Sequence, residues 1–190
     1  FLARRAIAGI EPTGLHAVFK GLWKDLEEVT PISFINHVSE KSTVKWPDND
    51  ELERAIHSRP MGKSRIINYL LIEYDKFLPG DHAGDALTIE HILPQNFVTE
   101  GEWDGPFSKV EYKKYLETWA NLVPLSRPLN SSVQDASFAV KSKKYGEESM
   151  YVTPRQVASN WSEWNTTTLS ERAEMLIEFA KERWKYFPIE

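Results

Sequence analysis

The sequence predicts a mainly α-helical (α+β) fold, in which two short β-strands and a following helix are embedded among longer helices. Three observations support this class. Apolar residues recur at helical spacing through most of the 190 residues. Two short runs, "ALTIEHI" and "ANLVPL", are instead typical of strands, and a Pro-containing turn follows each. Seven Trp, seven Tyr and nine Phe supply enough apolar surface for a folded core.

The first 80 residues carry helical patterns only. Thr30 followed by Pro31 is a typical helix start, with a capping hydroxyl and then Pro at the first helical position. Asp or Asn ahead of Glu51 indicates a second start. We expect helices over 14–28, 30–40, 46–58 and 64–78, the last being the most apolar and central to a core.

The pattern changes after residue 80. A strand is expected in "ALTIEHI" (86–92), which Pro94 ends, and a second in "ANLVPL" (120–125). Between them, 108–119 returns to helical spacing. Three further helices are expected: one over about 133–145, one opened by the capping box "TPRQ" at Thr153, and a final one opened by "TLSE" at Thr168 and running through Tyr186.

Composition excludes several classes of protein. Without cysteine there are no disulfides and no thiolate metal or redox site, and zinc is disfavoured. No apolar run approaches the roughly 20 residues of a membrane span, so a cytoplasmic protein without membrane contact is the simplest interpretation. The net charge of -5 argues weakly against nucleic-acid binding by the chain as a whole. Because the sequence begins without Met, we expect a piece of a longer protein.

One group of polar residues has the arrangement expected of a catalytic metal site. Glu90 and His91 end the first predicted strand, Asn121 begins the second, and Asn130 follows nine residues later. Lys141 lies on the helix after them. Strand, long connection, strand and helix is the layout of a ββα-metal unit, in which two strand ends and a helix hold one divalent ion.

These residues resemble a known family. The segments "IEHILPQ" (89–95), "NLVPL" (121–125), Asn130 and "FAVKSKKYGEES" (138–149) are similar to HNH nucleases of the His-Me finger class. More narrowly, the chain resembles the C-terminal nuclease module of GmrSD-type modification-dependent restriction enzymes, a module also found in phosphorothioate-sensing phage-defence proteins. The helical flanks look alike too, so the resemblance spans nearly the whole chain; one departure is Ala120, where the family usually has Gly.

The resemblance implies a Mg²⁺-dependent DNA endonuclease, with Mn²⁺ able to substitute, acting by nicking or cleavage. His91 is expected to take a proton from the attacking water, and Asn121 to order the loop or orient His91. Glu90 and Asn130 would supply oxygen ligands, which suit Mg²⁺. Successive strand side chains alternate in direction, so Glu90 and His91 should reach one phosphate from different angles. DNA backbone contacts are expected from Lys141, Lys143 and Lys144.

The implied organisation has three parts: a helical N-terminal part (1–80), an HNH core (81–150) and C-terminal helices that pack on it (151–190). The implied role is the effector of a phage-defence restriction protein, whose N-terminal, nucleotide-dependent sensor domain is not in this sequence. We expect no nucleotide binding by this chain itself, because "GLHAVFKG" and "PMGKS" lack the P-loop pattern.

Simpler interpretations remain open. The chain could be a non-catalytic helical DNA-binding or regulatory domain with a degenerate nuclease scaffold, or an RNase. Asn130 also fits a helix N-cap, Glu90 a surface carboxylate, and Gln95 either a turn residue or part of the site's lining. We interpret the Trp residues, including Trp161, Trp164 and Trp184, as core rather than as base-stacking surfaces.

Overall fold

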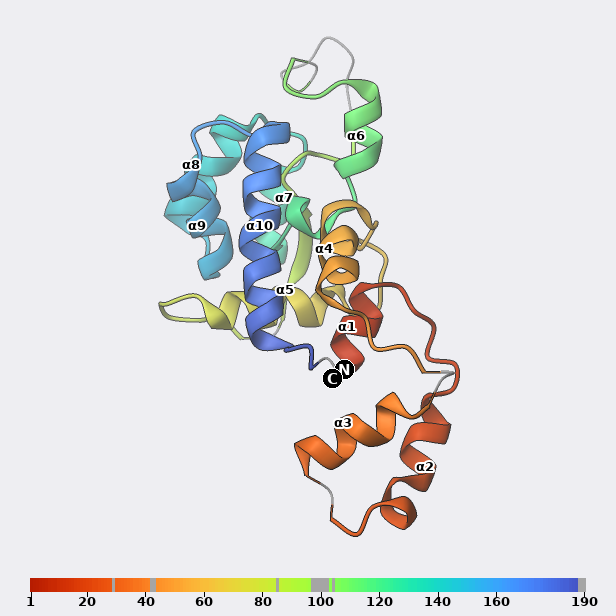
Figure 1. The fold of residues 1–190 in the computed structure, drawn as a ribbon. Helices are drawn as coiled ribbons and strands as arrows, with labels where there is room; N and C mark the ends of the chain where they lie inside the picture. The colour runs from red at the N-terminus through yellow and green to blue at the C-terminus, as the bar shows by residue number, and fades with distance from the viewer. Residues whose placement is uncertain (29, 42–43, 85, 97–102, 104, 188–190) are drawn as a thin grey trace.

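The mainly helical class is confirmed by the structure, a computed structural model that describes residues 1–28, 30–41, 44–84, 86–96, 103 and 105–187 (Figure 1). Within these residues a two-stranded sheet is surrounded by helices. The elements in chain order are α1 (Leu2–Ile7), α2 (Leu15–Asp25), α3 (Pro31–Ser39), α4 (Asn49–Ser58), α5 (Ile67–Phe77), β1 (Thr88–His91), α6 (Lys109–Tyr115), the 3-10 turn η1 (Trp119–Asn121), β2 (Leu122–Leu125), α7 (Arg127–Val133), α8 (Phe138–Glu148), α9 (Val152–Asn160) and α10 (Thr166–Arg183).

Both predicted strands form, and they pair with each other. β1 and β2 are antiparallel, with Glu90 opposite Val123 and His91 opposite Leu122. All four residues of β2 are buried, whereas β1 buries only Glu90 and leaves its other side chains partly exposed. The sheet therefore anchors β1 to the core through β2 and leaves the Glu90–His91 end near the surface.

Local sequence signals set several helix starts. Thr30 caps α3 and Asp48 caps α4, each in a capping box with the residue three positions on. Three predicted starts are wrong. The helix expected from about residue 133 is α8, which begins at Phe138 after the N-cap Ser137. Thr153 lies inside α9, whose N-cap is Tyr151. α10 begins three residues earlier than expected, because Asn165 is its N-cap and Thr168 is the reciprocal partner in the box.

The main core contains residues from all three predicted parts of the chain, from Ile7 to Ala180. α10 crosses the middle of this body and packs against α4, α5 and η1, while α8 and α9 pack together on one side (Figure 1). Trp164 is buried in this core and both Trp161 and Trp184 pack against it, as the sequence predicts. No helix in the described residues is long and apolar enough to cross a membrane.

The helices α2 and α3 form a separate small body at the bottom of Figure 1. Its own core consists of Val18, Val38 and Val44, with aromatic side chains such as Phe34 and Trp46 packed against them. His37 is buried here, with Nε2 3.1 Å from the carbonyl oxygen of Val18. These contacts place α2 and α3 away from the strands.

Candidate active site

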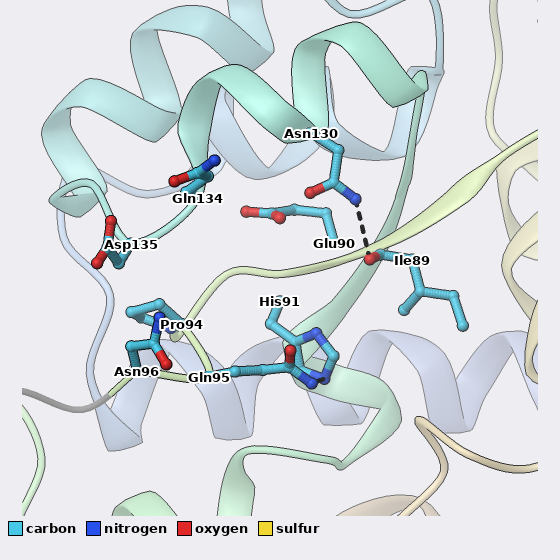
Figure 2. Close-up of a pocket in the computed structure, with 9 residues that line it drawn as sticks. All are labelled: Ile89, Glu90, His91, Pro94, Gln95, Asn96, Asn130, Gln134 and Asp135. Atoms are coloured by element: carbon cyan, nitrogen blue, oxygen red, sulfur yellow. Dashed lines mark hydrogen bonds between the residues drawn. The ribbon is translucent and has the colours of Figure 1, made fainter.

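A cleft of about 240 Å³ opens at the end of β1. Three of the sequence-predicted residues, Glu90, His91 and Asn130, line it together. Its full lining is Ile89, Glu90, His91, Pro94, Gln95, Asn96, Asn130, Gln134 and Asp135 (Figure 2). Residues from β1, from the turn after it and from α7 thus meet at one place, although 40 positions separate Glu90 from Asn130 in the chain.

Glu90 and His91 leave β1 on opposite sides, as strand geometry predicts (Figure 2). The Glu90 carboxylate is buried, and its Oε1 accepts hydrogen bonds from Lys141 Nζ (2.7 Å) and from the Tyr145 hydroxyl (2.8 Å). It is therefore no surface carboxylate. Burial raises the pKa of Glu90 and lowers that of Lys141, and their mutual attraction opposes both shifts.

Asn130 lies within α7, which is capped by Ser126, so the N-cap interpretation of Asn130 is wrong. Its Nδ2 donates to Thr88 Oγ1 (2.9 Å) and to the carbonyl oxygen of Ile89 (3.0 Å). These two bonds fix the amide, and Figure 2 shows its oxygen on the same side of β1 as the Glu90 carboxylate. α7 was not expected from the sequence; the segment "SRPLN" had the pattern of a turn.

The His91 imidazole is held by a residue that the sequence did not single out. Its Nε2 lies 3.2 Å from Oε2 of Glu117, and the side-chain nitrogen of Gln95 is 3.5 Å away. In the described part of the chain, no hydrogen bond involves Nδ1. No spacing rule connects residues 91 and 117, so only the fold reveals this pair; Gln95, whose role was open, lines the cleft.

Asn121 is fully buried and is not part of the cleft lining. Its Nδ2 donates to the carbonyl oxygens of Leu93 (3.0 Å) and Leu116 (2.9 Å). Its Oδ1 accepts from Leu93 N (2.8 Å) and from the indole of Trp164 (3.2 Å). Asn121 thus ties down the turn that follows His91, and no hydrogen bond of the described residues joins it to the imidazole.

Arg172 supports the same region from α10. Its guanidinium is fully buried and donates to the carbonyl oxygens of Trp119, Ala120 and Leu122. Burial lowers the pKa of Arg172 to about 10. By holding η1 and the start of β2, this side chain fixes the segment that carries Asn121.

The prediction that Lys141 contacts DNA is wrong, because its side chain is fully buried. Besides Glu90, its Nζ donates to the carbonyl oxygen of His91 at 2.7 Å. Lys143 is exposed on α8, and Lys144 donates to Ser132 Oγ (3.0 Å) and lies nearer the surface than Lys141. Lys141 therefore joins α8 to the end of β1, and only the other two lysines remain candidates for phosphate contacts.

The connection between α7 and α8 adds two residues to the cleft, Gln134 and Asp135. Gln134 has a φ of 35°, the one positive φ outside glycine in the described residues. Such backbone strain persists where the surrounding structure imposes it, and it is common near functional sites. The strained turn places the Asp135 carboxylate in the cleft wall.

The donor atoms of the cleft determine which metal ion it could hold. No group of three His, Asp or Glu residues is close enough to hold a metal in the part of the chain that the structure describes. The oxygen donors that line the cleft are the carboxylates of Glu90 and Asp135 and the side-chain amides of Gln95, Asn96, Asn130 and Gln134. Few oxygen ligands in an open cleft suit Mg²⁺ or Mn²⁺, which keep several waters, and do not suit Zn²⁺.

Comparisons with known proteins give one match. A family model described as "GmrSD restriction endonucleases, C-terminal domain" matches residues 46–179. This range contains the whole cleft, Glu117 and Lys141, and it excludes the small body formed by α2 and α3. No curated protein and no solved structure matches the chain.

Proposed function

The chain belongs to the family of GmrSD restriction endonuclease C-terminal domains, and on that premise we propose that it hydrolyses DNA phosphodiester bonds at the cleft of Glu90, His91 and Asn130. A restriction-endonuclease domain has DNA as its substrate. The HNH-type, Mg²⁺-dependent chemistry and the residue roles are the proposal. The observation that carries it is the meeting of an imidazole with carboxylate and amide oxygens in one open cleft.

His91 is the proposed general base. Its Nε2 is engaged by Glu117, which leaves Nδ1 to take a proton from the attacking water. Glu90 and Asn130 would hold Mg²⁺ through Oε2 and Oδ1, the oxygens of their side chains that accept no hydrogen bond in the described structure. The ion, when bound, would draw charge from a phosphate oxygen and from the leaving 3′ oxygen.

The protein around the cleft holds these groups in place before substrate arrives. Lys141 and Tyr145 bond the other oxygen of Glu90, while Thr88 and the Ile89 carbonyl fix the Asn130 amide. Side chains locked in this way lose little freedom when they act, which favours catalysis. Lys143 and Lys144 on α8 are proposed to contact the DNA backbone.

A second candidate function is a non-catalytic DNA-binding or regulatory domain, and one observation favours it. The ammonium of Lys141 lies 2.7 Å from the carboxylate proposed to bind metal, which reduces the negative charge available to a cation. Metal binding distinguishes the two functions, because a degenerate scaffold needs no divalent ion.

The test is a plasmid-nicking assay with Mg²⁺, Mn²⁺ or EDTA, comparing the wild type, His91→Ala and His16→Ala. His16 is an exposed histidine on α2 and is the matched control. We expect metal-dependent nicking that His91→Ala abolishes and His16→Ala retains. Labelled RNA in place of plasmid tests the RNase alternative.

A direct measurement of Mn²⁺ binding by calorimetry accompanies the assay, with Glu90→Gln and Asn130→Ala as variants. Saturable binding that both variants weaken supports the proposed ligands. If the wild type neither binds Mn²⁺ nor nicks DNA with any divalent ion, the nuclease proposal is wrong and the non-catalytic domain is favoured.

The wider role is also a proposal. As the effector of a restriction protein, the domain would be controlled by an N-terminal sensor that uses nucleotide and recognises modified DNA. Joining this chain to such a sensor is expected to make nicking depend on the modification, and nicking that ignores it would contradict this role.

A further inference from the structure

We propose that Glu117 is a positioning residue for His91, and that glycine at position 62 exists to leave room for it. This inference rests on the proposed function, since it concerns how the general base is prepared. Glu117 immediately precedes Thr118 and η1, and its carboxylate contacts the imidazole of His91.

The contact is specific to one atom of each side chain. Oε2 of Glu117 lies 3.2 Å from Nε2 of His91, and the two side chains are only 25% and 13% exposed. A carboxylate accepts and does not donate, so Nε2 must carry the hydrogen that is shared. The neutral ring is then held as the Nε2–H tautomer, and its lone pair is at Nδ1.

Backbone hydrogen bonds hold the main chain at Glu117 in place. Its carbonyl oxygen accepts from the amides of Met61 and Gly62, the second at 3.2 Å. An isolated antiparallel bridge between Pro60 and Thr118 continues this pairing. The connection between α4 and α5 therefore lies directly beside the Glu117–His91 pair.

Gly62 is where this connection comes closest. A Cβ on residue 62 would lie 1.8 Å from Oε2 and 3.0 Å from Cδ of Glu117, and 3.5 Å from Nε2 of His91. Only the far end of a flexible side chain is in the way, so an alanine there can be accommodated when the Glu117 carboxylate swings aside. Gly62→Ala thus breaks the pair without altering either member.

The pair is partly exposed and is made by one contact, so it contributes little to folding. Its effect is expected in the reaction. An imidazole that is free to rotate or to adopt the other tautomer presents Nδ1 to the water for only part of the time. Residues that orient a histidine in this way typically change metal-site affinity or activity by about 10–100-fold.

The first test is kinetic. The nicking rate at saturating plasmid and the plasmid KM are measured for the wild type, Glu117→Ala, Gly62→Ala and the double variant. We expect each single variant to lower the rate at saturation by about 10–100-fold with KM and Mn²⁺ affinity unchanged. The double variant should be no slower than the slower single variant, because both changes remove one interaction.

Three further variants complete the kinetic test. Glu117→Gln retains an oxygen that can accept from Nε2–H, so it should recover part of the lost rate. Glu163→Ala, an exposed carboxylate between α9 and α10, and Gly105→Ala, where a Cβ meets nothing within 4 Å, are the matched controls and should behave as wild type.

The second test does not depend on activity. Nitrogen NMR of the histidine side chains, recorded with the neutral ring, reports which nitrogen carries the hydrogen. We expect His91 to be the Nε2–H form in the wild type and a mixture of both tautomers in Glu117→Ala and Gly62→Ala. An unchanged tautomer in both variants overturns the inference even if the domain proves to be inactive.

The two proposals fail separately. If the wild type nicks DNA and His91→Ala does not, but Glu117→Ala and Gly62→Ala keep the wild-type rate, then the nuclease proposal stands and the positioning role is wrong. If the wild type is inactive but Glu117 controls the tautomer of His91, the contact is real and the nuclease proposal is wrong.

Discussion

Replacing Lys141 with Met removes the ammonium that neutralises Glu90 and keeps a side chain of similar length. The pair is buried: the side chains of Lys141 and Glu90 are 0% and 4% exposed, and their charged atoms are 2.7 Å apart. Without Lys141, the Tyr145 hydroxyl is the one hydrogen-bond donor to the Glu90 carboxylate that remains among the described residues, and the His91 carbonyl oxygen loses the bond from Lys141. Removing one member of such a pair typically costs about 3–5 kcal/mol.

The lost free energy of unfolding can be worked out from the protonation of Glu90 in the variant. An unpaired buried carboxylate takes up a proton, which at pH 7 costs about 3.7 kcal/mol, at about 1.36 kcal/mol for each of the roughly 2.7 units above the ordinary Glu pKa of about 4.3. The lost bond to the His91 carbonyl adds about 1 kcal/mol. We therefore expect Lys141→Met to lower the free energy of unfolding by about 5 kcal/mol at pH 7, the upper end of that range.

The stability lost in Lys141→Met should be smaller at low pH, because proton binding by Glu90 is linked to folding. In Lys141→Met the pKa of Glu90 in the folded protein lies further above its unfolded value, so protonated Glu90 favours folding. This contribution is complete below the unfolded pKa and is lost as the pH rises toward the folded pKa. The difference from wild type should therefore be clearly smaller at pH 5 than at pH 7.

The assay is urea unfolding followed by Trp fluorescence, in EDTA, at pH 5, 6 and 7. Lys143→Met, an exposed lysine two positions along α8, is the matched control and should change stability by less than about 0.5 kcal/mol. The double variant Glu90→Gln with Lys141→Met should recover to within about 1.5 kcal/mol of wild type, because no charge is left unpaired. Equal stability of the Lys141 and Lys143 variants at pH 7, or a loss independent of pH, would refute this reasoning.

Three further predictions concern the groups around the cleft. Asn121→Ala removes the four hydrogen bonds of the Asn121 side chain and should lower the free energy of unfolding in urea by about 4 kcal/mol, at about 1 kcal/mol per bond; a loss below about 1 kcal/mol would contradict the anchoring role. Tyr145→Phe removes one bond to a charged group and should cost about 1.5–2 kcal/mol, which the same measurement checks. Asn130→Ala should weaken Mn²⁺ binding in calorimetry by at least about tenfold, or about 1.4 kcal/mol, and unchanged affinity would exclude Asn130 as a ligand.

Sequence and structure agree where the physics is local. Helical spacing predicts α2, α3, α4 and α5 because it records which side of each helix is buried, whereas the six-residue α1 (Leu2–Ile7) was not predicted. The caps at Thr30 and Asp48 are correct because a capping side chain bonds backbone only three positions away. "TPRQ" was misleading for the same reason, since a capping pattern can also occur inside a helix that begins earlier.

The strands and the meeting of Glu90, His91 and Asn130 in one cleft agree with the residue pattern, although Asn130 reaches the cleft from a helix that the sequence did not predict. The family assignment likewise follows from the sequence and is shown by the match over residues 46–179. The sequence pattern therefore predicts both strands and identifies the main candidate residues of the cleft.

Tertiary structure decided what each of those residues touches. A lysine on a helix looks the same in sequence whether it faces solvent or a buried carboxylate 51 positions away, and Lys141 does the latter. Glu117 lies beside His91 because η1 and β2 bring the chain back to the end of β1. Partners of this kind are chosen by packing between distant segments, and no local rule of spacing or capping carries that information.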